Sequence, residues 1–215
     1  MLVKDRMTID PIAITPDTSF PEAYGILREK GIRHLPVLDD TGNVVGIVAK
    51  SDLLHASPAT DRTLSIFEVN YLLANMHVHE VMSSPPITVD EDTPLEEAAR
   101  VMVQKKIGCL PVMRGSTLAG MITETDIFET FVEVLGGEEA SLRVTLRVPD
   151  VHGELARVSG LIAELGGNIC SVARFRGEDP QYCYITLRLE GVDEDVLVPA
   201  LKNEVEEVVH VCCAS

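Results

Sequence analysis

GIVAKSDL (residues 46–53) and GMITETDI (residues 120–127) are two copies of one pattern. Each copy begins with an apolar run, turns polar and reaches an aspartate, Asp52 or Asp126, before a new apolar stretch begins. This change of pattern predicts a buried strand that leads into a helix. The aspartate then lies near the start of the helix, where its carboxylate either caps free backbone N–H groups or faces a cleft.

The two copies belong to a longer internal repeat, in which Val3–Val37 overlays Val78–Val112 without a gap. Each unit predicts the element order β-α-β-β-α, with its first helix ending at Gly31 or Gly108. One such unit is too small to bury a core of its own, so we expect the two units to pack face to face. The matched pairs include Met7/Met82, Pro11/Pro86, Asp17/Asp92, Thr18/Thr93, Ala23/Ala98 and Ile32/Ile107.

These residues resemble a tandem pair of CBS (cystathionine-β-synthase) domains over about the first two-thirds of the chain. The resemblance rests on MTIDP at residues 7–11, MSSP at residues 82–85, two LPV segments and the two endings on aspartate. It implies an α+β fold with a first repeat over residues 1–56, a linker helix over 57–77 and a second repeat over 78–137. It also implies two clefts that bind adenosine-containing ligands, such as AMP, ADP, ATP or S-adenosylmethionine.

The cleft expected around Asp126 is called cleft A. A ribose offers two neighbouring hydroxyls, and one carboxylate can accept hydrogen bonds from both. By resemblance, the adenine would lie against residues from the opposite repeat, and Arg33 and Lys50 are the cations best placed to meet phosphates. The alternative is that both aspartates only cap helices. The residues expected in cleft A are Ile12, Ala13, Ile32, Arg33, Lys50, Thr123, Thr125 and Asp126.

The cleft expected around Asp52, cleft B, departs from the family pattern because Ala49 stands where the other copy has Thr123. Loss of one neutral hydrogen bond costs about 0.5–1.5 kcal/mol. We therefore expect cleft A to be occupied by the ligand and leave the occupancy of cleft B open. The residues expected in cleft B are Ser51, Asp52, Ser83, Ile87, Thr88, Ile107 and Gly108.

From about Leu142 the pattern changes, and residues 138–215 predict the order β-α-β-β-α-β of a ferredoxin-like unit. DVHGELARVSGLIAELGGNI (residues 150–169) closely resembles the ACT domain, a regulatory module that binds amino acids. His152 replaces the proline usual in that loop, which leaves the ligand open. The alternative is that this unit only pairs its exposed strand edge with a second copy. The resemblance implies an amino-acid site formed by Gly153, Glu154, Leu155, Asn168 and Ile169.

Composition narrows the range of partners. The chain has 34 acidic and 18 basic residues, and a net charge of −16 repels nucleic acid and anionic lipid.

Without a secretory signal or an apolar run of membrane-spanning length, we expect a soluble, cytoplasmic protein. The five cysteines contain no C-x-x-C motif, which favours buried thiols over a zinc site or disulfides. His77 and His79 alternate, but two ligands do not make a metal site, so no metal is expected.

We therefore expect a non-enzymatic, ligand-sensing regulator that forms a homodimer, with a regulated enzyme as a candidate partner. The order of a CBS pair followed by an ACT unit is similar to proteins of acetoin utilisation. Two alternatives stay open. One is an interaction subunit without a small-molecule ligand. The other is an enzyme with Cys109 or Cys183 as its nucleophile, although neither has a neighbouring His and Asp signature.

Overall fold

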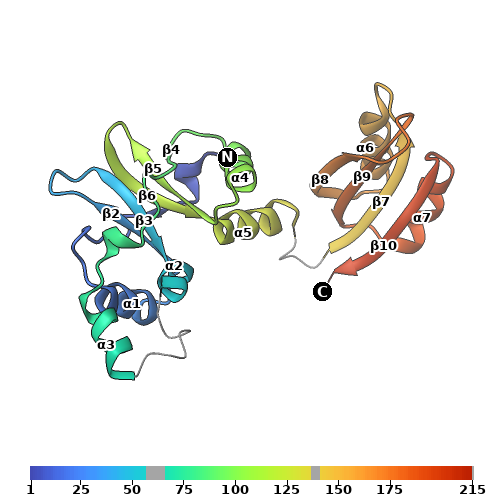
Figure 1. Ribbon diagram of the computed structural model, residues 1–215. Coiled ribbons are helices and arrows are strands. Elements are labelled where there is room, and N and C mark those ends of the chain that lie inside the picture. The colour runs from blue at the N-terminus through green and yellow to red at the C-terminus, as the bar shows by residue number, and fades with distance from the viewer. Residues whose placement is uncertain (57–65, 137–140, 215) are drawn as a thin grey trace. The chain divides into compact units, whose positions relative to one another are not determined.

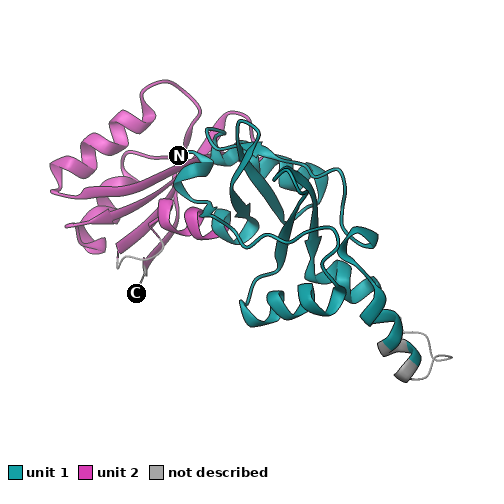
Figure 2. Ribbon diagram, turned by 90° about the vertical axis from the view of Figure 1, so that its left-hand side faces the viewer, with its two compact units in different colours: residues 1–127 teal, residues 128–215 magenta. Residues whose placement is uncertain are grey.

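The computed structural model describes residues 1–56, 66–136 and 141–214, and Figure 1 labels its helices and strands. The chain forms two compact units, Met1–Ile127 and Phe128–Ser215, shown in two colours in Figure 2. The part of the expected linker helix over residues 57–65 lies outside the described residues. Among the described helices, each is too short or too polar to cross a membrane.

The first unit contains two copies of the predicted order β-α-β-β-α, which is thereby confirmed. The first copy consists of β1 (Thr8–Ile9), α1 (Phe20–Glu29), β2 (His34–Leu38), β3 (Val44–Ala49) and α2 (Lys50–Ala56). The second consists of β4 (Val89–Asp90), α4 (Leu95–Lys105), β5 (Cys109–Arg114), β6 (Thr117–Thr123) and α5 (Glu124–Val134), whose end lies in the second unit. Each copy opens with a short 3-10 turn, Val3–Asp5 or Val78–Glu80, and α3 (Ile66–Asn75) lies between the copies.

The two repeats exchange their first extended segments. β1 of the first repeat pairs with β6 of the second, with Thr8 opposite Met121, in a sheet of order β1-β6-β5-β4. The matched contact on the other side is the bridge between Ile47 and Ser83, beside the sheet β2-β3. The repeats therefore interlock, and residues from both lie at the ends of β3 and β6, where the two aspartates follow.

Each repeat buries its own apolar helix face against its own strands. In the first repeat, Ala23 and Leu27 of α1 pack with Leu35 of β2 in one buried cluster. In the second, Met102 of α4 and Leu110 of β5 belong to the matched cluster. Every third or fourth side chain of such a helix faces the sheet, and this explains the helical spacing of apolar residues in the sequence.

The helix ends differ between the repeats. Gly31 follows α1 with a φ of +67°, a left-handed conformation that glycine adopts without steric cost, so the predicted end is confirmed. The prediction for Gly108 is wrong, because α4 ends at Lys105 and the left-handed residue is Lys106, with a φ of +55°. Lys106 matches Gly31 in the repeat alignment, whereas Gly108 matches Arg33.

The second unit has the element order β-α-β-β-α-β that the sequence predicts. Its strands form one antiparallel sheet of order β10-β7-β9-β8, so β8 and β10 are the edges. Leu146, Ile162 and Leu201 belong to its fully buried core. The elements are β7 (Ser141–Pro149), α6 (Glu154–Glu164), β8 (Asn168–Arg176), β9 (Tyr182–Glu190), α7 (Glu194–Lys202) and β10 (Glu207–Ala214).

The exposure of each cysteine depends on the strand that carries it. Cys109 and Cys183 are buried, as expected, but Cys170 and Cys213 are exposed, because they lie on the two edge strands of the second sheet. Cys183 of β9 lies opposite Arg176 of β8, at the far end of that strand from Cys170. Cys170 and Cys183 are therefore not cross-strand neighbours.

Candidate functional site

Each aspartate of the repeated pattern is fixed by the residue three positions before it. Asp126 Oδ2 accepts hydrogen bonds from Thr123 N and Thr123 Oγ1, both at 2.7 Å. Asp52 Oδ2 accepts a hydrogen bond from Ala49 N at 2.9 Å. The carboxylates therefore bind backbone N–H groups at the strand-to-helix turn, as the capping interpretation expects, and the repeat with threonine adds a second bond.

Capping does not exclude a cleft, because Asp126 also lines a cavity. Cleft A has a volume of about 340 Å³ and takes its walls from both repeats. It includes six of the eight expected residues, whereas Ala13 and Lys50 do not line it. Its lining residues are Thr8, Asp10, Pro11, Ile12, Gly31, Ile32, Arg33, His34, Met121, Thr123, Thr125 and Asp126.

Asp52 lines a second cavity of about 340 Å³, also shared between the repeats. This is cleft B, and all the residues expected in it line it except Thr88. Its lining residues are His34, Ile47, Ala49, Ser51, Asp52, Ser83, Pro85, Pro86, Ile87, Lys106, Ile107, Gly108 and Cys109.

The residues that sequence reasoning missed have a common signal in the repeat. Ser83 was expected in cleft B, and its repeat partner Thr8 lines cleft A at the matched position. Gly31 and Lys106 are likewise partners, one in each cleft. Applying the pseudo-twofold relation to the expected Ser83 and Thr123 finds Thr8 and Ala49 without any coordinates, whereas neither Gly31 nor Lys106 has an expected partner from which it could be found.

Arg33 is the cation that lines cleft A. It lies between α1 and β2 of the first repeat, and its Nη2 donates a hydrogen bond to Thr125 Oγ1 of α5 at 2.7 Å. This bond crosses from one repeat to the other. It holds the guanidinium at the N-terminus of an 11-residue helix, where the helix dipole also favours an anion.

His34 lines both clefts, and Cys109 is its partner in the repeat. Partial burial, followed by the charge of Arg33, lowers the pKa of the His34 imidazole. Burial raises the pKa of the Cys109 thiol to about 12, with smaller contributions from Asp52 and Glu124. A thiol of this kind stays protonated at neutral pH, which argues against Cys109 as a nucleophile.

The second unit holds a cavity of about 530 Å³ beside the start of α6. Gly153 precedes the helix with a φ of +93°, and the Arg174 guanidinium forms an ion pair with Asp150 at the same place. Of the five expected residues, Gly153, Glu154 and Leu155 line this cavity, together with Asp150, Val151, His152, Arg174, Cys183 and Ile185.

Asn168 and Ile169 do not join that cavity within one chain. They pair with Glu190 and Leu189, whereas the cavity residue Cys183 lies near the other end of β9. Within one chain, Asn168 and Ile169 therefore lie apart from the other three expected residues, and the five-residue site stays a prediction. The cause is the crossover through α6, which carries the chain from the end of β7 back to the opposite end of the sheet, where β8 starts.

The alternating histidines also have a local explanation. The rings of His77 and His79 stack with their centroids 5.8 Å apart, and His79 Nδ1 lies 3.0 Å from the Pro16 carbonyl oxygen. No group of three or more potential metal ligands occurs among residues 1–56, 66–136 and 141–214.

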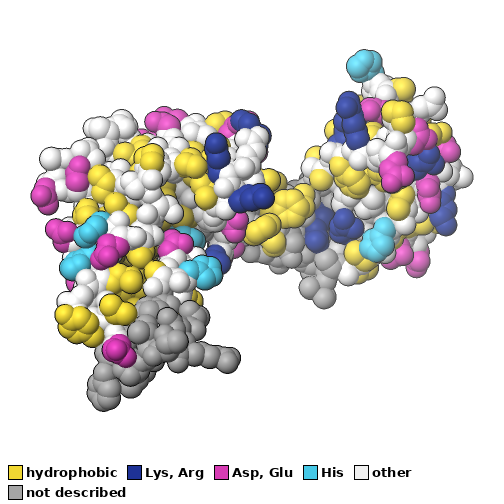
Figure 3. Space-filling model, in the orientation of Figure 1, with side chains coloured by type: hydrophobic (Ala, Val, Ile, Leu, Met, Phe, Trp, Pro, Cys, Tyr) yellow, Lys and Arg dark blue, Asp and Glu magenta, His cyan; other side chains and the backbone are white. Residues whose placement is uncertain are grey.

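On the face drawn in Figure 3, Lys and Arg side chains form small separate groups rather than a continuous basic surface.

The match to known families settles the identity of the repeats. Residues 3–59 and 78–133, more than half of the chain, match the CBS domain. This chain belongs to the CBS domain family. The match leaves the second unit without a family assignment, so its resemblance to the ACT domain stays a prediction.

Several CBS proteins are similar to this chain. Protein MJ1404 of Methanocaldococcus jannaschii is 34% identical over 134 residues, 61% of this chain and 32% of its own length. The chain therefore spans about a third of that relative. A CBS domain-containing protein of Dictyostelium discoideum is 32% identical over 139 residues, 63% of this chain and 94% of its own.

Three solved structures of CBS proteins share the fold with a TM-score of 0.52 each. The CBS domain pair of protein MJ0100, in complex with 5′-methylthioadenosine and S-adenosyl-L-methionine, is 29% identical and covers 65% of this chain and 98% of that one. CBSX2 in complex with AMP is 29% identical, with coverages of 62% and 97%. A Vibrio cholerae protein named for acetoin utilisation (AcuB) is 30% identical, with coverages of 65% and 98%.

Proposed function

We propose that this CBS-domain protein is a non-enzymatic regulator that binds an adenosine-containing ligand in cleft A. The observation that carries the proposal is Asp126, a carboxylate fixed by Thr123 at the wall of a 340 Å³ cavity built from both repeats. Similar CBS structures in complex with AMP, or with 5′-methylthioadenosine and S-adenosyl-L-methionine, support the class of ligand.

The lining of cleft A matches the three parts of such a ligand. The Asp126 carboxylate accepts hydrogen bonds from the two ribose hydroxyls. Ile12 and Ile32 supply the apolar walls that an adenine ring needs. Arg33 and the start of α5 meet a phosphate, since the guanidinium and the helix dipole both favour an anion.

Regulation follows from the walls of the cleft. A ligand that touches both repeats stabilises the relative arrangement that closes around it, by no more than its difference in affinity between the two arrangements.

In this proposal the repeats span residues 1–56 and 78–137, with a linker at 57–77 and an ACT-like unit at 138–215. The protein acts in the cytoplasm, with a regulated enzyme as a candidate partner. The similarity to AcuB supports a role near acetoin utilisation.

The second unit contributes dimerisation and an amino-acid site. β8 is an edge strand, and its Val172 and Phe175 are each about half exposed. Antiparallel pairing of β8 with β8 of a second copy brings the Asn168 end of one chain beside the Gly153 cavity of the other. The five residues expected to bind an amino acid then meet across two chains, which a single chain does not achieve.

A ligand panel tests the proposal. Thermal unfolding of the full chain is measured with AMP, ADP, ATP, S-adenosylmethionine and free amino acids. A ligand at about 100 times its Kd adds ~2.7 kcal/mol to the stability of the state that binds it. We expect this stabilisation with an adenosine ligand and its loss in Asp126→Ala, while the control Glu129→Ala, an exposed carboxylate on the same helix, retains it. A flat response to all ligands favours the interaction subunit instead.

A further inference from the structure

The two clefts differ in charge at one matched position, where the connector after the first helix of a repeat meets the second helix of the same repeat. At cleft A, Lys50 N donates a hydrogen bond to Arg33 O at 2.9 Å. At cleft B, Glu124 N donates the matched hydrogen bond to Gly108 O at 3.0 Å. Both repeats therefore form this backbone hydrogen bond. The basic residues Arg33 and Lys50 of the first repeat are replaced by Gly108 and Glu124 in the second.

Arg33 is positioned to meet an anion in cleft A. It lines the cavity, and its bond to Thr125 Oγ1 fixes the guanidinium at the first turn of α5. A guanidinium presents five N–H donors in one plane, so a single bond to a hydroxyl still leaves it suited to a phosphate. Fixing the side chain in advance also reduces the entropy lost when the ligand binds.

At the matched position beside cleft B, the Glu124 carboxylate lies against Gly108, although Glu124 is not itself one of the residues that line the cavity. Glu124 Oε2 lies 3.4 Å from the position that a Cβ on Gly108 would occupy, and Gly108 lines the cavity. The charge of Glu124 also acts on the neighbouring Cys109 thiol. Its pKa is raised to about 12 by burial and then by the charges of Asp52 and Glu124, with a smaller opposing effect of Arg33.

Building on the proposed function, we infer that the two clefts sort adenosine ligands by charge. Cleft A takes the ligand that carries a 5′-phosphate. Cleft B takes a ligand whose 5′ substituent is neutral or cationic, such as a thioether or a sulfonium. A phosphate dianion in cleft B would face Asp52 and Glu124 without an arginine at the matched position, whereas a sulfonium is attracted by both carboxylates.

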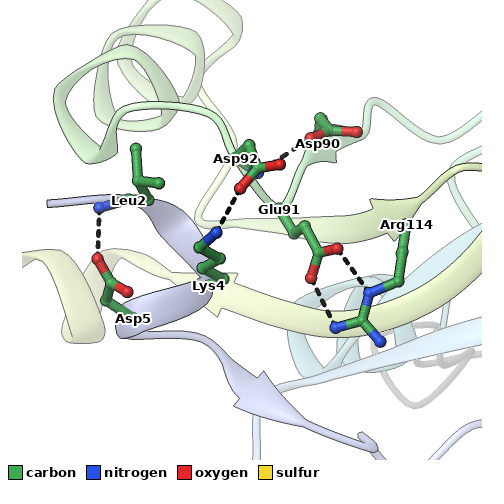
Figure 4. Close-up of polar contacts among 7 residues, drawn as sticks. All are labelled: Leu2, Lys4, Asp5, Asp90, Glu91, Asp92 and Arg114. Atoms are coloured by element: carbon green, nitrogen blue, oxygen red, sulfur yellow. Dashed lines mark hydrogen bonds and ion pairs between the residues drawn. The ribbon is translucent and has the colours of Figure 1, made fainter.

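The lining of cleft A contains a second carboxylate, Asp10, besides Asp126, and the lining of cleft B contains one cation, Lys106. Asp10 lines cleft A, but the Arg114 guanidinium lies near it: the pKa of Arg114 is raised by hydrogen bonds to Glu91 and further by the Asp10 carboxylate. Figure 4 shows Arg114 held by Glu91 at 2.5 and 2.7 Å. Lys106 lines cleft B on an exposed, flexible stem, in contrast to the fixed Arg33.

The test isolates one cleft at a time in the full chain. Isothermal titration calorimetry with AMP, adenosine and S-adenosylmethionine is performed on Asp52→Ala, which leaves cleft A, and on Asp126→Ala, which leaves cleft B. In cleft A we expect AMP to bind at least about tenfold more tightly than adenosine. In cleft B we expect AMP to bind at least about tenfold more weakly than adenosine or S-adenosylmethionine, where each tenfold step corresponds to about 1.4 kcal/mol.

Two further variants assign the effect to charge. Glu124→Gln in the Asp126→Ala background keeps the shape of an exposed side chain and is expected to raise the AMP affinity of cleft B about tenfold. Lys105→Ala in that background removes an exposed lysine that does not line cleft B, and this control is expected to change the ratio of AMP to adenosine affinity less than about twofold. In the otherwise unaltered chain, Glu124→Gln is expected to raise the number of AMP sites from one to two, a readout that does not depend on the stability of the aspartate variants.

Equal ratios of AMP to adenosine affinity in the two clefts would overturn charge sorting while leaving the proposed function intact. An unchanged AMP affinity in Glu124→Gln, or a tenfold change of that affinity in the control Lys105→Ala, would also overturn it. Absence of binding of all three ligands to the unaltered chain would overturn charge sorting and the proposed function together.

Discussion

Asp126 accepts hydrogen bonds within its own repeat and also lines a cleft. Its Oδ2 accepts two hydrogen bonds from Thr123, while the residue lines a cavity shared by both repeats. The interactions that orient a carboxylate are what make it useful to a ligand, because a fixed acceptor loses little entropy on binding. Capping therefore does not compete with the proposed binding, because the same hydrogen bonds serve both.

The extra threonine bond gives a prediction for the paired variants Thr123→Ala and Ala49→Thr. Thr123→Ala removes the Oγ1 hydrogen bond to Asp126 and is expected to lower the free energy of unfolding by about 0.5–1.5 kcal/mol and to weaken AMP binding. Ala49→Thr installs the missing hydroxyl beside Asp52 and is expected to leave AMP affinity of cleft A unchanged. Urea unfolding and calorimetry measure both effects. Full AMP affinity in Thr123→Ala would show that the hydroxyl does not orient Asp126 for the ligand.

The His34 imidazole predicts a pH dependence of stability. Burial and the charge of Arg33 lower the folded-state pKa of His34, so the unfolded chain binds its proton more readily. This contribution to stability is present above the unfolded pKa of about 6.5 and is lost as pH falls through the folded pKa. Between pH 7 and pH 5, the fall in the free energy of unfolding is expected to be smaller in His34→Gln.

The control for that experiment is His152→Gln, which removes one imidazole at an exposed position of the second unit. It is expected to leave the slope of stability against pH as it is in the unaltered chain. Parallel slopes for His34→Gln and the unaltered chain would contradict the role of His34.

The limits of sequence reasoning at this scale are visible in two neighbouring pairs. Ile12 and Ile87 line their clefts, whereas the next residues, Ala13 and Thr88, do not. In an extended segment successive side chains point to opposite sides, so adjacent residues seldom share one wall. The aspartates were predictable because their pattern is local. His34 was not, because its place between the clefts depends on how the repeats interlock.

At the scale of the elements, the exchange of strands between repeats is the main feature that local periodicity does not predict. The order β-α-β-β-α is readable from apolar spacing within each repeat. The pairing of β1 with β6 joins segments far apart in the chain, and its register depends on close backbone approach at Gly120, which lies opposite Ile9.

Gly120 therefore gives a prediction for stability. A Cβ at this position would lie 2.6 Å from Thr8 O and 2.6 Å from Met7 Sδ, closer than real atoms approach. Gly120→Ala is expected to lower the free energy of unfolding by about 1–3 kcal/mol, because the strand must shift away. The control Gly25→Ala lies within α1 with nothing inside 4 Å and is expected to stabilise the chain by about 0.5–1 kcal/mol. Equal stabilities of the two variants would contradict the close packing of β1 on β6.

At the scale of the whole molecule, the proposed function assigns ligand binding to the first unit and self-association to the second. Val172 lies at the middle of β8 and is about half exposed, so full antiparallel pairing of two copies places the two Val172 residues opposite each other. Val172→Lys sets two like charges in direct opposition and is expected to convert a dimer into a monomer. Sedimentation velocity measures this change, and AMP affinity is expected to stay the same.

Val209→Lys on the other edge strand, β10, is the matched control and is expected to keep the dimer. A dimer in both variants, or a monomer in the unaltered chain, would remove β8 from this role. The element order of the second unit was predictable from alternation and turns. The separation of Asn168 from Gly153 within one chain was not predictable from the local motif, because it depends on the length of the α6 crossover relative to the sheet.

A crystal structure of the full chain with AMP tests the central claim most directly. The account predicts the nucleotide in cleft A, with both ribose hydroxyls within hydrogen-bond distance of the Asp126 carboxylate and the phosphate beside Arg33. AMP bound away from Asp126, or cleft A closed by the protein's own side chains at saturating AMP, would contradict it.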